Sequence, residues 1–288
     1  MGAHFISQSV LMVNIGQFNR LTVTKLVNFG VYLDAGEHDN ILLPRRDVPP
    51  DCKVGDKLHV FIYHDSEDRL IATTRKPLAM VGDTRLLKVK DTGPFGAFLD
   101  WGLDKDLLVP FGQQRRPMEV GHSYVVHLYI DEYTERVVAS SKLNHFLSET
   151  ADQFQANQEV DLLVCQRTDI GYKAVINQTH LGVIFTADLL QPLKIGEKLK
   201  GYIKQIRADG KIDLSLQLQG QEVRDQLADL ILEHLRTHGG VSDLTDKSTP
   251  EDIYRQYQVS KGNYKKAIGG LYKKRLIHIE KDCIRLSN

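Results

Sequence analysis

Residues 92–100, with the sequence TGPFGAFLD, decide how the whole chain is interpreted. Two aromatic residues three apart lie on either side of a glycine, at the start of an alternating apolar run. Residues 28–34 (NFGVYLD) are a close copy of this stretch, and residues 169–175 (DIGYKAV) are a diverged one. The same local signature therefore occurs three times.

A second glycine follows each signature at a constant distance. Gly55, Gly121 and Gly196 each lie 25 residues after the signature glycine, between an apolar residue and a second apolar run. A constant interval beside a repeated motif indicates an internal repeat. We therefore expect three related domains.

Each repeat contains five short apolar runs separated by turn residues. In the first repeat these runs are residues 21–24, 31–33, 41–44, 58–63 and 70–73. Five short strands in about 65 residues are typical of a small Greek-key barrel of the OB type. The predicted domains are residues 12–79, residues 80–147 and, for the diverged repeat, residues 156–218.

The last part of the chain, residues 220–288, changes to a helical period of about 3.6 residues. One face of its first helix would carry Val223, Leu227, Leu230, Ile231 and His234. Thr249-Pro250 and Ser260 have the residue types that begin helices. Two strand-like runs, 276–279 and 283–286, follow. Three helices and a hairpin predict a winged helix-turn-helix, so the fold class is multidomain: mainly β, with an α+β end.

Bulk properties narrow the possible functions. Lys plus Arg equals Asp plus Glu at 37 each, so any site for a polyanion must come from local clustering. Cys52, Cys165 and Cys283 form no CxxC pair, and their odd number argues against a disulfide framework. No apolar run approaches the roughly 20 residues that cross a bilayer. We expect a cytoplasmic protein that does not enter membranes.

The sequence lacks the common motifs of enzyme active sites. The sequence has no GxSxG, P-loop or HExxH motif and no cluster of paired carboxylates. His234 and His238 have a spacing that can hold a metal, but no third ligand is apparent nearby. We therefore expect no catalytic residues, no metal and no cofactor.

The repeated aromatic residues are the best candidates for a binding function. The glycine bend would let Phe29 and Tyr32, and likewise Phe95 and Phe98, reach one open surface of each barrel. Exposed rings on such a surface stack unpaired bases. The alternative is that one ring of each pair fills the barrel core.

The signature, the later glycine turn and a closing strand that ends in Ser resemble the S1-type RNA-binding domain. That resemblance implies an OB-fold whose RNA face uses the two signature aromatics, a histidine after the third strand, and an Asp and an Arg near the last hairpin. The matching positions are Phe29, Tyr32, Asp65, Arg69, Phe95, Phe98, Asp131 and Arg136. The histidine is absent, since Pro44 and Pro110 occupy its place. In the third repeat, Ile170 and Lys173 replace both aromatics.

Cations cluster in the second half of the chain. Residues 194–211 hold six cations and two acids, and residues 261–275 hold six cations and no acid. Phosphate attraction depends on local cation density, although a charge run is also a common solvated surface. The predicted phosphate contacts are Lys173, Lys204, Arg207, Lys211, Lys261, Lys265, Lys266, Lys273 and Lys274.

Three such domains followed by a winged helix resemble the bacterial conserved virulence factor B family of RNA-binding regulators. This resemblance implies binding of single-stranded RNA and a role in post-transcriptional or general gene-expression regulation. Two alternatives stay open. One is a DNA-binding transcription regulator that acts through the winged helix, and the other is a protein-docking scaffold. The sequence leaves the oligomeric state open.

Overall fold

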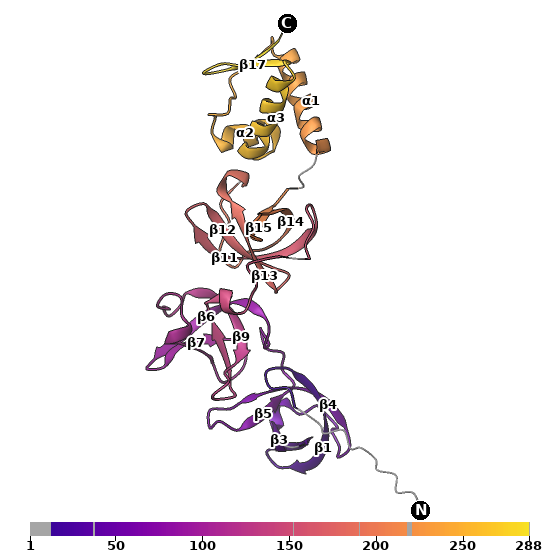
Figure 1. The fold of residues 1–288 in the computed structure, drawn as a ribbon. Coiled ribbons are helices and arrows are strands. Elements are labelled where there is room, and N and C mark those ends of the chain that lie inside the picture. The colour runs from indigo at the N-terminus through magenta and orange to yellow at the C-terminus, as the bar shows by residue number, and fades with distance from the viewer. Residues whose placement is uncertain (1–12, 37, 152, 190, 218–220, 288) are drawn as a thin grey trace, which may run out of the picture. The chain divides into compact units, whose positions relative to one another are not determined.

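The computed structural model describes the chain except for residues 1–12, 37, 152, 190, 218–220 and 288. The chain divides into two compact units, residues 1–143 and 144–288. The first unit holds two five-stranded β-domains, and the second holds a third β-domain and a helical domain (Figure 1). The predicted fold class is confirmed. The predicted domain limits stay predictions, and their end residues 12, 218, 220 and 288 lie outside the described part.

The first barrel is closed. Its strands are β1 (Phe18–Val27), β2 (Gly30–Ala35), β3 (His38–Pro44), β4 (Lys57–His64) and β5 (Leu70–Thr73). They are paired in the order β1-β2-β3-β5-β4, and β3 and β5 run parallel. Alternate residues point inward, so Leu21, Leu33, Leu43 and Ile62 are fully buried.

The second β-domain has the same order of elements. Its strands are β6 (Thr84–Gly93), β7 (Gly96–Asp100), β8 (Leu107–Pro110), β9 (Ser123–Ile130) and β10 (Val137–Ser140). They form one sheet in the order β10-β9-β6-β7-β8. Among the described strands, β8 and β10 form no ladder. Instead the Ser141 amide donates to the Gln113 carbonyl at 3.0 Å, which holds the two edges of the barrel together.

The third barrel is closed like the first. It consists of β11 (Glu159–Thr168), β12 (Gly171–Ile176), β13 (His180–Phe185), β14 (Lys198–Ile206) and β15 (Ile212–Ser215). The order β11-β12-β13-β15-β14 matches that of the first barrel, including the parallel pair β13–β15. In all three barrels a single 3-10 turn follows the third strand: η1 (Arg45–Asp47), η2 (Phe111–Gln113) and η4 (Thr186–Asp188).

The constant glycine interval has a structural cause. The first strand of each barrel shifts register directly after a valine. The carbonyl of this valine accepts a hydrogen bond from the second glycine of the repeat: Val23 from Gly55 at 2.8 Å, Val89 from Gly121 at 2.9 Å and Val164 from Gly196 at 2.7 Å. All three glycines have positive φ angles, 92°, 84° and 87°, which other residues rarely adopt.

The signature glycines serve strand packing. A Cβ atom on Gly30, Gly96 or Gly171 would overlap a backbone carbonyl oxygen of the third strand, which no side-chain movement can relieve. Glycine is therefore required because the second and third strands approach each other closely. This reason differs from the expected one, which was a bend that lets the two rings share a surface.

The C-terminal domain has the winged-helix order. Its elements are α1 (Gln221–Thr237), β16 (Val241–Ser242), α2 (Pro250–Tyr257), α3 (Lys261–Lys273), β17 (Ile277–Ile279) and β18 (Ile284–Leu286). The Thr249 and Ser260 hydroxyls cap α2 and α3 by accepting from the amides of Asp252 and Asn263. The short strand β16 was not predicted, and it pairs with β18 at the edge of the hairpin.

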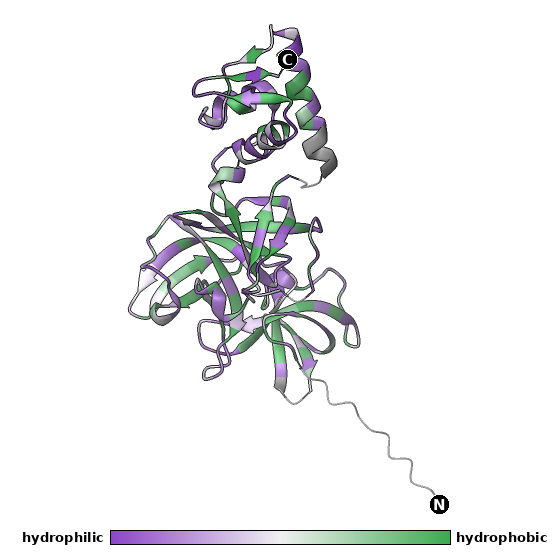
Figure 2. Cartoon of the chain, turned by 45° about the horizontal axis from the view of Figure 1, so that its top comes forward, coloured by the Kyte–Doolittle hydropathy of each residue, from purple (hydrophilic) through white to green (hydrophobic). Residues whose placement is uncertain are grey.

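The helices bury a continuous core. Ile231, Leu235, Ile253 and Tyr264 are almost fully buried in it. The expected α1 face is right for Leu227 and Ile231 but wrong for Leu230, which is 53% exposed. The side chain of Val223 lies outside the described residues. Figure 2 shows hydrophobic and hydrophilic positions alternating along the strands and helices. None of the described helices is long and apolar enough to cross a membrane.

The two barrels of the first unit share part of their cores. Phe61 and Tyr63 of β4 pack edge-to-face on Trp101, which follows β7, with ring centroids 5.8 and 6.0 Å apart. Asp104 adds ion pairs with Arg46 and with Arg75. Because aromatic rings bury large areas, these contacts make the two barrels one packed body.

Candidate nucleic-acid interface

The signature rings of the first barrel lie at its surface. Phe29, in the β1–β2 turn, is 58% exposed, and Tyr32 on β2 is partly exposed. Their rings meet edge-to-face at a centroid distance of 6.3 Å. The pair thus forms one small aromatic surface whose outer faces are open to a flat ligand.

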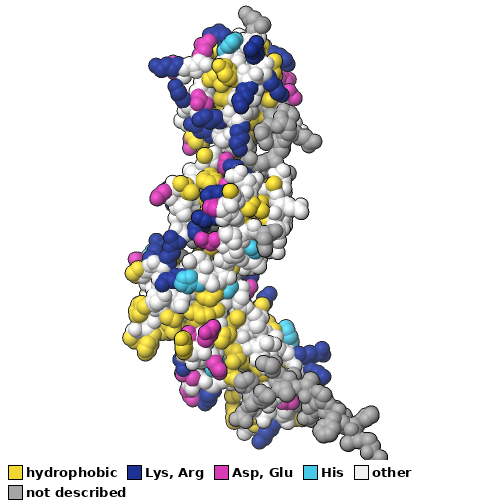
Figure 3. Space-filling view, viewed as in Figure 1, with side chains coloured by type: hydrophobic (Ala, Val, Ile, Leu, Met, Phe, Trp, Pro, Cys, Tyr) yellow, Lys and Arg dark blue, Asp and Glu magenta, His cyan; other side chains and the backbone are white. Residues whose placement is uncertain are grey.

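The second barrel carries the most exposed ring pair. Phe95 is 71% exposed, and the partly exposed Phe98 lies over Gly93, where a Cβ atom would come within 3.1 Å of its ring. Figure 3 shows hydrophobic side chains gathered on the part of the molecule that holds β7. None of the four signature rings is buried, so the alternative that one of each pair fills the core does not apply.

The third barrel has no ring at these two positions. Ile170 is 55% exposed, and the Lys173 ammonium group pairs with Glu149 at 2.7 Å. The neighbouring Tyr172 points into the core and is buried. This barrel therefore keeps the frame of the other two without their stacking surface.

One further position of the surface was missed in the sequence. The first residue of the 3-10 turn donates its amide to the carbonyl of the first signature residue in every barrel: Arg45 to Phe29 at 2.9 Å, Phe111 to Phe95 at 3.2 Å and Thr186 to Ile170 at 3.1 Å. Phe111 is 59% exposed. The signal was available, since Arg45 and Phe111 directly follow the prolines that replace the histidine of S1-type domains.

The Asp and Arg of the first hairpin form a close pair. The Arg69 guanidinium donates to the Asp65 carboxylate at 2.8 and 3.0 Å, and the backbone amides of Glu67 and Arg69 donate to the same carboxylate. Partial burial alone raises the pKa of Asp65, but these hydrogen bonds outweigh it and hold the pKa below its ordinary value. Asp65 thus orders the turn and fixes Arg69 at its edge.

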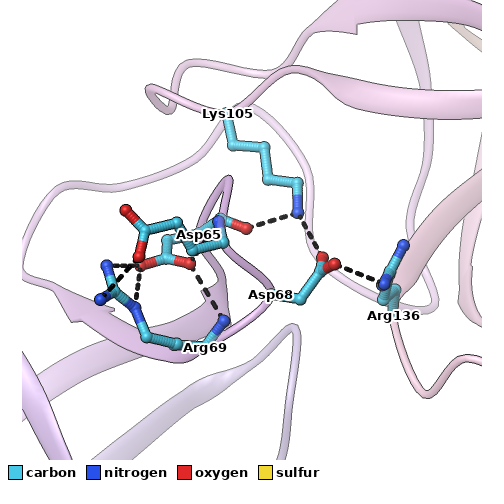
Figure 4. A network of polar contacts seen from close by, with 6 residues as sticks. Asp65, Asp68, Arg69, Lys105 and Arg136 are labelled. Carbon is cyan, nitrogen blue, oxygen red and sulfur yellow. Dashed lines mark hydrogen bonds and ion pairs between the residues drawn. The ribbon is translucent and has the colours of Figure 1, made fainter.

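The equivalent residues of the second barrel are arranged differently. Asp131 accepts hydrogen bonds from the side chain and amide of Thr134, both at 2.9 Å, which lower the pKa of its carboxyl. Arg136 instead reaches Asp68 of the first barrel at 2.6 Å, and Lys105 reaches the same carboxylate at 3.3 Å (Figure 4). Arg136 therefore links the two barrels.

Two cations of the third barrel are held by buried carboxylates. Lys204 pairs with Asp188, and Arg207 pairs with Asp213 at 2.6 Å. Both cations also lie 5.5 Å from the ring of Phe185. Both acids lie outside residues 194–211, so the charge count along the sequence did not include them. Lys211 pairs more loosely with Asp209 at 3.7 Å.

The winged helix presents cations, but the third barrel covers the N-terminal end of α3. Figure 3 shows Lys and Arg side chains over this domain, and Lys265, Lys266, Lys273 and Lys274 of the predicted set are exposed, with Lys261 partly exposed. At the N-terminus of α3, buried Asn263 donates to the Gln217 side chain of the third barrel at 2.8 Å. A Cβ atom on Gly262 would press on Asp188 and Ala187 of η4. The leading turn of α3 is thus packed on the barrel.

His234 of α1 and His238, directly after the helix, contact each other and the end of the helix. The rings of His234 and His238 lie 4.0 Å apart, and His238 Nδ1 is 2.9 Å from the His234 carbonyl oxygen. Burial and the neighbouring His238 lower the pKa of His234. Within the described residues no three His, Cys, Asp or Glu side chains gather as a metal site would require.

Comparison with known families gives two matches. The S1 domain family matches residues 15–75, and the CvfB-like winged helix domain matches residues 229–286. The fold and the site therefore define a chain built from domains of nucleic-acid-binding types.

Relatives of similar sequence cover nearly the whole chain. An uncharacterized protein YitL of Bacillus subtilis is 28% identical over 92% of this chain and 91% of its own length. Conserved virulence factor B of Staphylococcus epidermidis is 24% identical over 95% of both chains. A multidomain Streptococcus pneumoniae protein with nucleic acid binding domains aligns at 23% identity over 94% of this chain and 98% of its own, with a TM-score of 0.42. The resemblance to the conserved virulence factor B family is confirmed.

Proposed function

We propose that this chain is a non-catalytic RNA-binding protein of the cytoplasm that binds single-stranded RNA and acts in post-transcriptional or general gene-expression regulation. The observation that carries this proposal is a ring pair at the same position of two barrels, with Phe29 and Phe95 exposed and Tyr32 and Phe98 partly exposed. Apolar side chains that gather in an exposed patch mark an interaction site. Unpaired bases, whose faces are flat and apolar, fit them.

In this proposal the two units contribute different kinds of contact to RNA. The barrels of the first unit supply stacking, while cations of the winged helix attract phosphates. These are Lys265, Lys266 and Lys273 of α3 and Lys274 at its C-terminal end. In the third barrel, Lys204 and Arg207 contribute less to phosphate attraction than their number implies, because buried carboxylates already neutralise them. Of the predicted polar residues of the two hairpins, Asp65 and Asp131 mainly order their own turns, and Arg136 links the two barrels.

A DNA-binding regulator is the second candidate, and the packing of α3 weighs against it. A recognition helix reads the major groove with its N-terminal residues. Here the first turn of α3 packs on the third barrel through Asn263 and Gly262. Duplex binding of that kind would require the winged helix to separate from the barrel.

Fluorescence anisotropy on the full chain tests this proposal. The probes are an unstructured RNA, the single-stranded DNA of the same sequence and the corresponding DNA duplex, each at two salt concentrations. We expect the RNA to bind best, with an affinity that falls as salt rises. Equal or tighter binding of the duplex would favour the DNA-binding regulator. No binding of any nucleic acid would favour the docking scaffold.

A further inference from the structure

The residue after the third strand occupies a fixed place beside the first signature residue. In each barrel its amide is bound to the carbonyl of that residue, at 2.9 Å for Arg45, 3.2 Å for Phe111 and 3.1 Å for Thr186. The backbone thus places three different side chains at one equivalent position. All three are exposed.

We propose that this position is a third contact point for RNA and that its side chain decides what each barrel recognises. Phe111 stacks a further base in the second barrel, and Arg45 binds a phosphate in the first. Thr186 leaves the third barrel without such a contact. This inference rests on the proposed RNA-binding function.

The second barrel has the chemistry for a base at this position. Phe111 is 59% exposed and Phe95 is 71% exposed, although burial of either ring in the core would be favourable. The β7 region holds the hydrophobic patch that Figure 3 shows. Together with Phe98, Phe111 extends the surface from two rings to three, enough for consecutive unpaired bases.

The first barrel has the chemistry for a phosphate instead. The Arg45 guanidinium donates to the Asn28 carbonyl at 3.2 Å, which holds it at the β1–β2 turn beside Phe29. Among the described residues, Arg45 has no acidic partner in an ion pair. Its remaining N–H groups can bind a phosphate oxygen, which suits the planar guanidinium.

The third barrel provides the matched control. Thr186 has the same backbone contact but neither a ring nor a charge, and its neighbour Ile170 cannot stack as a ring does. Truncating the Thr186 side chain therefore shows the effect of a substitution at this position where no ring or charge is lost. Its exposure means that the fold tolerates the change.

The experiment compares three full-length variants, Phe111→Ala, Arg45→Gln and Thr186→Ala, with the parent protein. Affinity is measured with a fluorescein-labelled oligouridine, and stacking is measured with the same RNA in which 2-aminopurine replaces one base. Stacking quenches 2-aminopurine fluorescence. We expect Phe111→Ala to weaken binding by about 5- to 150-fold, to reduce quenching and to leave the salt slope unchanged. Arg45→Gln should lower the salt slope by about 0.7 with unchanged quenching. Thr186→Ala should change neither.

Two further variants make the result decisive. Phe111→Tyr keeps the ring and should bind like the parent, so a loss there together with Phe111→Ala would point to altered folding and overturn the assignment. If Phe111→Ala binds like the parent while Phe95→Ala is weakened, this inference is wrong and the proposed function stands. If Phe95→Ala also binds normally, the proposed function itself fails.

Discussion

The second and third barrels have the same frame and different surfaces. Gly96 and Gly171 make the same close approach to the third strand, and Gly121 and Gly196 donate the same hydrogen bond to the first strand. Yet Phe95 is an exposed ring where the third barrel has Ile170. The shared features keep the barrel folded, so the aromatic residues are free to serve another purpose.

The third barrel uses its turn η4 for packing within the chain. Asp188 of this turn forms an ion pair with Lys204 of the barrel, and it also lies against Gly262 of α3. In the first barrel, Asp47 of η1 has the equivalent place and pairs with Arg75, which reaches Asp104 of the second barrel. The turn after the third strand is thus a docking point for the following domain in both cases.

The largest effect on binding is expected from the rings themselves. The double variant Phe95→Ala with Phe98→Ala should weaken single-stranded RNA binding by about 1–3 kcal/mol for each ring removed. The matched change in the third barrel, Ile170→Ala, should leave the affinity unchanged. Anisotropy titrations of the full chain measure both. An equal loss for the two barrels would remove the distinction drawn between them.

Substitution of the signature glycine should destabilise the second and third barrels by similar amounts. Gly96→Ala and Gly171→Ala each place a Cβ against a backbone carbonyl, and we expect a loss of stability of about 1–3 kcal/mol or more. Gly112→Ala is the control, since no atom lies within 4 Å of its added Cβ. Denaturant unfolding followed by circular dichroism gives the comparison. Tolerance of Gly171→Ala alone would show that the third barrel has lost the shared frame.

A smaller effect is expected where α3 meets the third barrel. Asn263→Ala removes the hydrogen bond to Gln217, with a loss of about 1–2 kcal/mol. Hydrogen exchange should then rise in the first turn of α3 and in η4, while RNA binding by the first unit persists. Unchanged exchange at both places would mean that this contact does not hold the domain on the barrel.

The smallest expected effect is a pH dependence of the folding stability of the first unit. Burial lowers the pKa of His127, and burial together with Lys105 and Arg136 lowers that of His64. Below the ordinary value of 6.5 the unfolded chain binds more protons than the folded one, so stability decreases as pH falls from there. His127→Gln should flatten this dependence in thermal melts from pH 7 to pH 5. A melting temperature that rises on acidification would contradict it.

The sequence predicted the barrels well because their strands obey local rules. Period-two runs, turn residues and the two repeated glycines are all local. In the first barrel, β5 has the predicted bounds and β4 is one residue longer at each end, whereas β1 extends three residues beyond its predicted run at both ends and β3 begins three residues earlier. The caps Thr249 and Ser260 are local as well. The short strand β16 escaped prediction because its two residues have no period and pair only with β18.

The site was less predictable because it depends on long-range contacts. The charge of Lys204 and Arg207 is cancelled by Asp188 and Asp213, which only the folded barrel brings near. Arg136 reaches Asp68, which is 68 residues away in the chain. Phe111 was missed because the S1-type pattern draws attention to the preceding position, Pro110. The hydrogen bond from the Phe111 amide to the Phe95 carbonyl shows that Phe111 lies beside the signature rings.

The most direct test of the account is photo-cross-linking of the full chain to a single-stranded RNA that contains 5-iodouridine, with the adducts mapped by mass spectrometry. The central claim is that the first two barrels stack bases and the third does not. It predicts adducts on Phe29, Tyr32, Phe95 and Phe98, with none on residues 169–175. Adducts confined to residues 144–288 would contradict it.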